Sequence, residues 1–140
     1  MLKASLFAHG STEWTTPRWL FERLDQEFGF TLDPAATKEN ALCRQYFTQA
    51  QDGLQQDWGD HVVFLNPPYG RGIGRWVDKA LSALGTVVML LPARTDTKWF
   101  HALLDAGVKI RFVKGRLKFG EGTSSAPFPS IVAVKKGVVL

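Results

Sequence analysis

The stretch Val62-Val63-Phe64-Leu65-Asn66-Pro67-Pro68-Tyr69 changes within one residue from wholly apolar to polar and proline-rich. Its first four residues predict a buried strand, and the two prolines end that strand because proline has no N–H for a sheet ladder. A second apolar run, residues 86–91, has the composition of a strand covered on both faces of a parallel sheet. These runs indicate an α/β fold with polar groups at the ends of buried strands.

Helical signals lie on both sides of these strands. Trp14-Thr15-Thr16-Pro17 combines a threonine cap with a proline in the first turn, and apolar residues then recur at helical spacing up to Gly29. Helices are also expected over residues 73–84 and 97–106, with a short one over 37–42. Further strands are expected over residues 30–32, 44–48, 110–113, 117–119 and 131–134.

Helices and strands alternate first, and strands dominate the last third of the chain. This order predicts a mainly parallel sheet with an antiparallel hairpin at its C-terminal edge. Ligands of such sheets bind beyond the C-terminal ends of the strands. Asp33-Pro34, Asn66 to Tyr69 and Pro92-Ala93-Arg94 all follow strands, so we expect them to line one crevice.

The composition is that of one folded domain. The chain has 140 residues, of which 45% are hydrophobic and 21% charged, and this excludes a disordered chain. Residues 1–12 carry little periodicity and are expected to form a loose N-terminal arm, with 13–140 as a single domain. The net charge of +4 gives only a slight preference for a polyanionic partner.

The sequence carries no signal for a metal site or a membrane. Cys43 is the single cysteine, which excludes an internal disulfide and a cysteine-based metal cluster and indicates a reducing, cytoplasmic setting. The three histidines lack metal-ligand spacing, and no apolar run reaches the length of a membrane span or a signal peptide.

Asn66 to Tyr69 has the groups needed to activate an amine. The lone pair of an aromatic amine is delocalised, and two acceptors aimed at its N–H groups localise it. The Asn66 side-chain oxygen is one candidate acceptor, and the carbonyl of Pro67 is the other because Pro68 restricts its orientation. Tyr69 offers a ring for stacking. The alternative is a simple strand terminator, and the position between a buried strand and Gly70-Arg71-Gly72 favours the functional interpretation.

With these residues in place, the chain resembles the phage-type DNA adenine methyltransferase (Dam) family, which uses S-adenosylmethionine. The resemblance rests on short pieces that occur in order over almost the whole chain. They are Trp14 to Pro17, Leu32 to Ala36, Asp52 to Leu54 with Trp58, Asn66 to Tyr69, Leu90 to Thr97, Gly115 to Phe119 and Ala126 to Ser130. The fold it implies is a small Rossmann-like methyltransferase sheet, trimmed in its cofactor half because only about thirty residues separate Asp33 from Asn66.

The resemblance also implies cofactor contacts. Asp33, Pro34 and Ala35 stand where the wider methyltransferase pattern has a glycine-rich loop, although no Gly-x-Gly follows Asp33 here. Asp33 is the candidate partner of the cofactor's ammonium group, or alternatively a turn aspartate. The other implied contacts are Thr15, Thr16 and Pro17 at the methionine end, Asp52 at the adenine, or a plain Asp-Gly turn there, and Glu39 at the ribose hydroxyls.

Basic residues suggest a DNA partner, expected to be double-stranded, with the target adenine flipped out of the helix. Five of them alternate with apolar residues in one ribbon, and edge-strand protection is the equal alternative. The ribbon contains Lys109, Arg111, Lys114, Arg116 and Lys118, and Arg71, Arg75 and Arg94 are expected around the crevice.

Three functions remain open at this point. The first is methylation of adenine N6 in DNA. The second is methylation of another planar amine, such as a protein glutamine amide, which the same tetrad would serve. The third is a non-catalytic DNA-binding or anti-restriction module on the same scaffold, favoured by the missing glycines. The sequence gives no oligomeric state.

Overall fold

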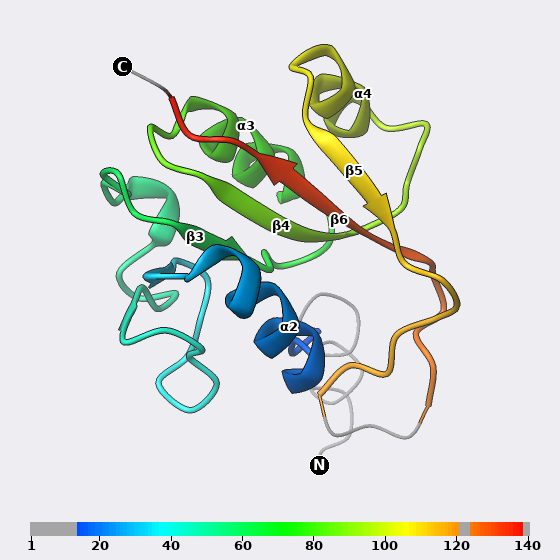
Figure 1. The fold of residues 1–140 in the computed structure, drawn as a ribbon, viewed down its shortest axis with the longest axis horizontal. Helices are drawn as coiled ribbons and strands as arrows, with labels where there is room; N and C mark the ends of the chain where they lie inside the picture. The colour runs from blue at the N-terminus through cyan, green and yellow to red at the C-terminus, as the bar shows by residue number, and fades with distance from the viewer. Residues whose placement is uncertain (1–13, 121–123, 139–140) are drawn as a thin grey trace.

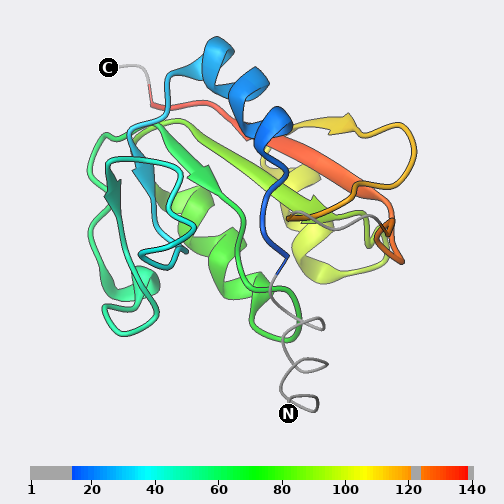
Figure 2. The same ribbon diagram turned by 90° about the horizontal axis from the view of Figure 1, so that it is seen from below.

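The computed structural model describes residues 14–120 and 124–138, which form a central sheet covered by helices on both faces (Figures 1 and 2). The proposed arm of residues 1–12 lies outside the described residues. The strands are β1 (Leu32–Asp33), β2 (Gln45–Tyr46), β3 (Val63–Leu65), β4 (Val87–Pro92), β5 (Lys109–Phe112) and β6 (Ser130–Lys135). The helices are α2 (Arg18–Phe28), α3 (Ile73–Ser82) and α4 (Lys98–Asp105), with a single 3-10 turn, η1 (Gly53–Gln55).

The sheet has six strands in the order β2-β1-β3-β4-β6-β5. The strands β2, β1, β3 and β4 are parallel, and β6 runs antiparallel to both β4 and β5. The mainly parallel sheet with an antiparallel C-terminal pair is thus confirmed, as is the α/β class. The pair is not a tight hairpin, because residues 113–129 connect its strands and β6 inserts between β4 and β5.

The expected glycine stop of α2 is confirmed, whereas the expected threonine cap at its start is wrong: the N-cap is Pro17 without a side-chain hydrogen bond, and Thr16 Oγ1 is bonded to Asn66 instead. Gly29 ends α2 in the left-handed conformation, with φ of 68°, and its N–H donates to the Asp25 carbonyl. Thr97 caps α4 by accepting a hydrogen bond from the Phe100 N–H at 3.2 Å. Figure 2 shows α2 on one face of the sheet and α3 and α4 on the other.

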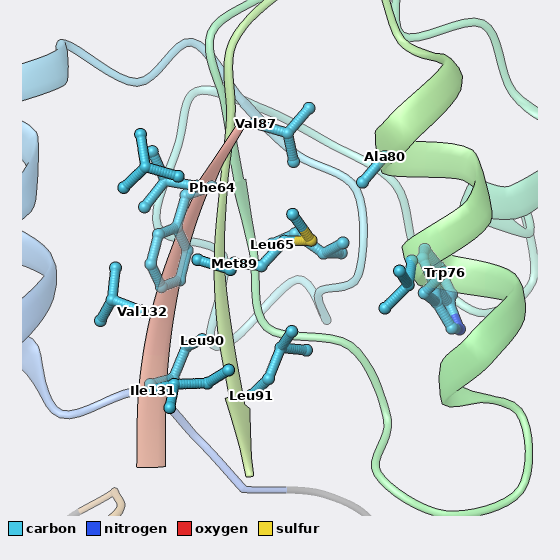
Figure 3. Close-up of a cluster of buried hydrophobic side chains, with 14 of the residues drawn as sticks. Phe64, Leu65, Trp76, Ala80, Val87, Met89, Leu90, Leu91, Ile131 and Val132 are labelled. Carbon is cyan, nitrogen blue, oxygen red and sulfur yellow. The ribbon is translucent and has the colours of Figure 1, made fainter. Parts of the chain in front are cut away.

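The core fills both sides of β3 and β4, every residue of which is buried. Phe64 points towards α2, where its ring meets Phe21 edge-on at 5.3 Å between centroids (Figure 3). Leu65 and Met89 point to the opposite side, towards Trp76 of α3 (Figure 3). Burial on both faces explains why these strands show no polar alternation, and it fixes the position of the residues that follow them.

Two expected elements are absent. Residues 37–42 form a turn instead of a helix, because Thr37 and Asn40 each accept a hydrogen bond from the other's backbone N–H, at 3.1 and 2.7 Å. Residues 117–119 are not a strand: β4 and β5 occupy both edges of β6, and Leu117 and Phe119 pack into the core as part of a loop. No helix among the described residues is long and apolar enough to cross a membrane.

Candidate active site

One cavity of about 650 Å³ opens at the C-terminal ends of β1 and β3. A volume of this size is typical of small-molecule sites. Four segments contribute to it: the chain before α2, the loop after β1, the region around η1 and the Asn66 loop. The lining residues are Trp14 to Thr16, Asp33 to Thr37, Asn40, Leu42, Thr48, Gln49, Asp52 to Leu54, Phe64, Asn66 to Tyr69, Arg71, Gly72, Arg75 and Trp76.

The side chain of Asn66 is oriented by the segment before α2. Its Nδ2 donates to the Trp14 carbonyl oxygen at 2.5 Å and to Thr16 Oγ1 at 2.9 Å. The Trp14 carbonyl can only accept, so the amide nitrogen and not the oxygen must face it. Both N–H groups of the amide are therefore used inside the protein.

The opposite atom of the same amide, Asn66 Oδ1, is buried and has no hydrogen-bond partner among the described residues. A buried acceptor without a donor is costly, so such an atom usually marks a place where a ligand or water supplies the donor. Among residues 14–120 and 124–138, no group donates to the Pro67 carbonyl either. Asn66 Oδ1 and the carbonyl of the next residue, Pro67, are thus both acceptors without a described donor, and both residues line the cavity.

Tyr69 has a more structural position than the sequence suggests. Its side chain is only 2% exposed, and its hydroxyl donates to the Leu90 carbonyl at 3.0 Å. Burial raises the pKa of this hydroxyl far above its usual range. The ring meets Phe119 and Phe128 edge-on, at 6.4 and 5.7 Å. Stacking of a planar ligand on Tyr69, as expected from the sequence, therefore requires Phe119 or Phe128 to move.

Trp14 extends this group into an aromatic cluster of Trp14, Tyr69, Phe119 and Phe128. Its ring lies edge-on to Phe119 at 5.5 Å and to Phe128 at 5.2 Å. A backbone bond from Gly120 N–H to the Thr15 carbonyl, at 2.6 Å, ties the loop after β5 to the same segment. The aromatic cluster forms an apolar surface beside Asn66 and was not evident from sequence spacing, because its members are up to 114 positions apart.

Asp33 is the buried one of the two aspartates that line the cavity. It is 4% exposed, and its carboxylate accepts hydrogen bonds from the backbone N–H groups of Leu42 at 3.1 Å and Ala35 at 3.4 Å. Burial raises its pKa to about 6, and the two backbone bonds oppose that rise. No cationic side chain pairs with it among the described residues. Asp33 thus stabilises a turn and also lines the cavity, so the two interpretations of this residue do not exclude each other.

Gly53 allows the close backbone approach that a glycine-rich loop after Asp33 was expected to provide. A Cβ at Gly53 would lie 2.1 Å from the Pro34 carbonyl oxygen, so the two backbones touch directly. The preceding Asp52 has φ of 58° and accepts the Leu54 N–H at 3.1 Å, which makes it the cap of η1. The loop after β1 lacks Gly-x-Gly, and here the close approach is provided by a glycine from the facing segment.

The cofactor residues implied by the resemblance divide into two groups. Thr15, Thr16, Pro34, Ala35 and Asp52 line the cavity with Asp33. Pro17 and Glu39 do not line it: Pro17 precedes the first turn of α2, and Glu39 is exposed on the 38–40 turn. The polar lining residues Thr37, Asn40, Thr48 and Gln49 were missed, because a polar loop carries no periodicity that would select them.

The basic residues also fall into two groups. Arg71 and Arg75 line the cavity, while Arg94, Lys114, Arg116 and Lys118 are exposed in the segments that follow β4 and β5. Since β4 and β5 point the same way, these segments lie at the same edge of the sheet as Asn66. Pro92, Ala93 and Arg94 do not line the cavity itself, contrary to expectation, because β4 continues through Pro92 and pairs with Ser130.

The strand part of the predicted ribbon is different. Arg111 forms a two-pronged ion pair with Glu27 of α2, at 2.8 and 2.6 Å, and lies over the Phe28 ring. This contact lowers the pKa of Glu27 and raises that of Arg111. Lys109 lies at the start of β5, level with Val134 of β6 and remote from the C-terminal edge. Arg111 thus fastens β5 to α2 and is not an unpaired cation.

Among the described residues no group of three or more histidine, cysteine, aspartate or glutamate side chains is arranged to hold a metal ion.

Comparison with known proteins gives concordant matches. The family model for DNA N-6-adenine-methyltransferase (Dam) matches residues 5–137. A DNA N-6-adenine-methyltransferase of Escherichia phage T1 is 34% identical over 109 residues, which cover 74% of this chain and 45% of that protein. One from Haemophilus phage HP1 is 30% identical over 132 residues, covering 86% of this chain and 76% of the relative. The putative methyltransferase YfdM of Escherichia coli K12 is 34% identical over 64 residues, which cover 41% of this chain and 70% of YfdM.

The chain spans less than half of the phage T1 relative and three quarters of the HP1 relative. The family match, by contrast, extends over almost all of the chain and includes every segment that lines the cavity. The chain belongs to the DNA N-6-adenine-methyltransferase (Dam) family.

Proposed function

We propose that this chain transfers a methyl group from S-adenosylmethionine to the exocyclic N6 amine of adenine in DNA. The observation that carries the proposal is the state of Asn66: both of its N–H groups are used within the protein, and its buried Oδ1 has no described partner. A site that only accepts hydrogen bonds selects a ligand that donates them, and an amino group does so. The neighbouring Pro67 carbonyl supplies the second acceptor for the second N–H.

The cavity residues suit the proposed cofactor. When bound, S-adenosylmethionine supplies an electrophilic methyl group on a sulfonium centre. The buried Asp33 carboxylate, which has no cationic partner among the described residues, is suited to the cofactor's ammonium group. Asn40 and Gln49 replace Glu39 as candidates for the ribose hydroxyls, because they line the cavity and Glu39 does not. Catalysis then consists mainly of positioning and hydrogen bonding to the amine.

The surroundings of the site favour a nucleic acid as the amine donor. Arg71, Arg94, Arg116 and Lys118 lie at the same edge of the sheet as Asn66, where they can contact phosphates. An adenine within a double helix cannot reach a cavity, so we propose that the base is flipped out. The aromatic cluster beside Asn66 offers an apolar place for it once Phe119 or Phe128 moves aside. The free Cys43 makes the reducing cytoplasm the proposed setting.

The same two acceptors would also serve a glutamine amide in a protein. The basic residues at the edge of the cavity favour DNA over that alternative, because a protein amide has no phosphates to pair with them. The binding-module alternative was favoured by the missing loop glycines, and the backbone contact at Gly53 weakens it.

The test is incubation of the purified chain with methyl-labelled S-adenosylmethionine and unmethylated duplex DNA, followed by nucleoside analysis. We expect label in 6-methyladenine. Single-stranded DNA and a glutamine-containing peptide serve as parallel substrates, and DNA already methylated on adenine is the negative control. Intact DNA binding without 6-methyladenine would instead identify a binding module, and label in the peptide alone would identify a protein methyltransferase.

A further inference from the structure

The chain before α2 and the Asn66 loop are about 50 residues apart in sequence, and two hydrogen bonds of the Asn66 side chain join them, one of them to the Thr16 side chain. Thr16 is only 7% exposed, and its Oγ1 accepts the N–H of Asn66 Nδ2 at 2.9 Å. The resemblance to methyltransferases places Thr16 among the cofactor contacts. The geometry assigns it a different task.

We propose that Thr16 is a positioning residue that keeps the Asn66 side chain in the orientation in which Oδ1 faces the substrate amine. The inference rests on the proposed function. The Trp14 carbonyl accepts one N–H of the amide, and this single hydrogen bond leaves the amide able to turn about it. The second N–H needs its own acceptor, and Thr16 Oγ1 is that acceptor.

The consequence of removing this acceptor follows from the chemistry of the amide. Without Thr16 Oγ1, one N–H of Asn66 would be left buried without a partner. The amide would then turn to satisfy it, by pointing this N–H towards the cavity or towards solvent. Either motion moves Oδ1 away from the incoming N–H group, and a misplacement of about 1 Å lowers a rate on the order of 100-fold.

The position of Thr16 is itself fixed from two sides. Pro17, whose carbonyl accepts N–H groups of the first turn of α2, ties it to that helix, and Gly120 donates to the Thr15 carbonyl from the loop after β5. Thr16 therefore lies on a segment that hydrogen bonds hold on both sides, and its own hydrogen bond to Asn66 restrains the amide. No other described side chain donates to or accepts from the Asn66 amide.

The experiment compares Thr16→Val, Thr16→Ser and Thr16→Ala at saturating cofactor and saturating DNA. Valine has the shape of threonine but no acceptor, so we expect kcat to fall on the order of 10–100-fold, with KM for DNA and Kd for S-adenosylmethionine within about threefold of the wild type. Serine keeps the hydroxyl and should retain kcat within a few-fold. If valine prevents folding, alanine removes the same acceptor without adding bulk and is compared with serine instead.

Thr86→Val is the matched control. Thr86 Oγ1 also accepts one hydrogen bond, from the Gly137 N–H at 2.9 Å, but it precedes β4 at the opposite edge of the sheet. The Thr86→Val variant should have a lower melting temperature and an unchanged kcat. Wild-type kcat in Thr16→Val, or a loss confined to the Kd of S-adenosylmethionine, would overturn the positioning role and support a cofactor contact. Failure of the proposed function is a separate outcome, in which the wild-type chain itself forms no 6-methyladenine.

Discussion

The two walls of the cavity are built on different physical principles. The wall around Asn66 is assembled from side chains: two hydrogen bonds orient the amide, and the four rings of the aromatic cluster pack together, mostly edge-on. The wall around Asp33 is assembled mostly from backbone, within about twenty residues of sequence, with Gly53 pressed against the Pro34 carbonyl. Under the proposed function, single side chains would control the chemistry at the first wall, whereas the shape of the second wall depends on the path of the backbone.

The largest effect is expected from Asn66→Ala, which removes one of the two acceptors. We expect kcat to fall at least on the order of 100–1,000-fold, as for the loss of a group that stabilises the transition state. DNA affinity, measured by fluorescence anisotropy, should stay within about threefold. A protein that loses its fold instead would support the interpretation of Asn66 as a strand terminator.

Gly53→Ala tests the backbone wall. The new Cβ would meet the Pro34 carbonyl at 2.1 Å, so the loop after β1 must shift. We expect a loss of about 1–3 kcal/mol in the free energy of unfolding and a clear loss of cofactor affinity in calorimetry. Gly74→Ala is the control: it lies inside α3 with its nearest contact at 3.9 Å and should stabilise the protein by about 0.5–1 kcal/mol. Unchanged cofactor affinity in Gly53→Ala would contradict the tight contact.

The pH dependence of cofactor binding tests whether the ionised Asp33 carboxylate contacts the cofactor. Burial raises the pKa of Asp33 to about 6, and an ammonium group pairs with the ionised form. Affinity for S-adenosylmethionine should therefore fall below pH 6, roughly tenfold at pH 5 relative to neutral pH. Asp33→Asn should bind weakly at both pH values and show no such slope. A wild-type affinity that does not change with pH would remove Asp33 from the ammonium contact.

The same carboxyl has the opposite effect on the stability of the cofactor-free protein. Its pKa is higher in the folded chain than the usual value of 3.8, so between about pH 4 and 6 the folded state binds more protons than the unfolded state. The free energy of unfolding contributed by Asp33 is thus greatest below this range and falls as the pH rises through it. Denaturant titrations at pH 5 and 7.5 measure the difference, which Asp33→Asn should reduce.

The smallest effects are expected from substitutions of basic residues. Their effect on DNA binding should depend on which edge of the sheet the residue occupies. Lys118→Ala, at the edge that carries Asn66, should reduce the slope of log K against log salt by about 0.9 if it contacts one phosphate. Lys109→Ala, at the far end of β5, should leave the slope unchanged. Arg111→Ala should change the slope little because Arg111 is engaged by Glu27. Equal slopes for all three variants would contradict the assignment of DNA to this edge.

The sequence predicted the elements whose environment is simple. The apolar runs of β3 and β4 are buried on both faces, and Gly29 ends α2 through a local backbone contact. Prediction failed at residues 37–42, where side chains of the turn compete for backbone N–H groups, and at 117–119, where strand-like residues pack as a loop. Local patterns cannot show which of two competing partners a backbone group finds.

By itself, the sequence determined the α/β class, the position of Asn66 at the end of a buried strand and the likeness to a family, because periodicity and motif order are local properties of the chain. The tertiary structure was needed to show that Trp14 and Thr16 orient Asn66, that Gly53 contacts the Pro34 carbonyl at the second wall of the cavity, that Tyr69 is covered by aromatic rings and that Arg111 is paired. These facts depend on contacts between segments far apart in sequence, and the packing of the sheet brings those segments together.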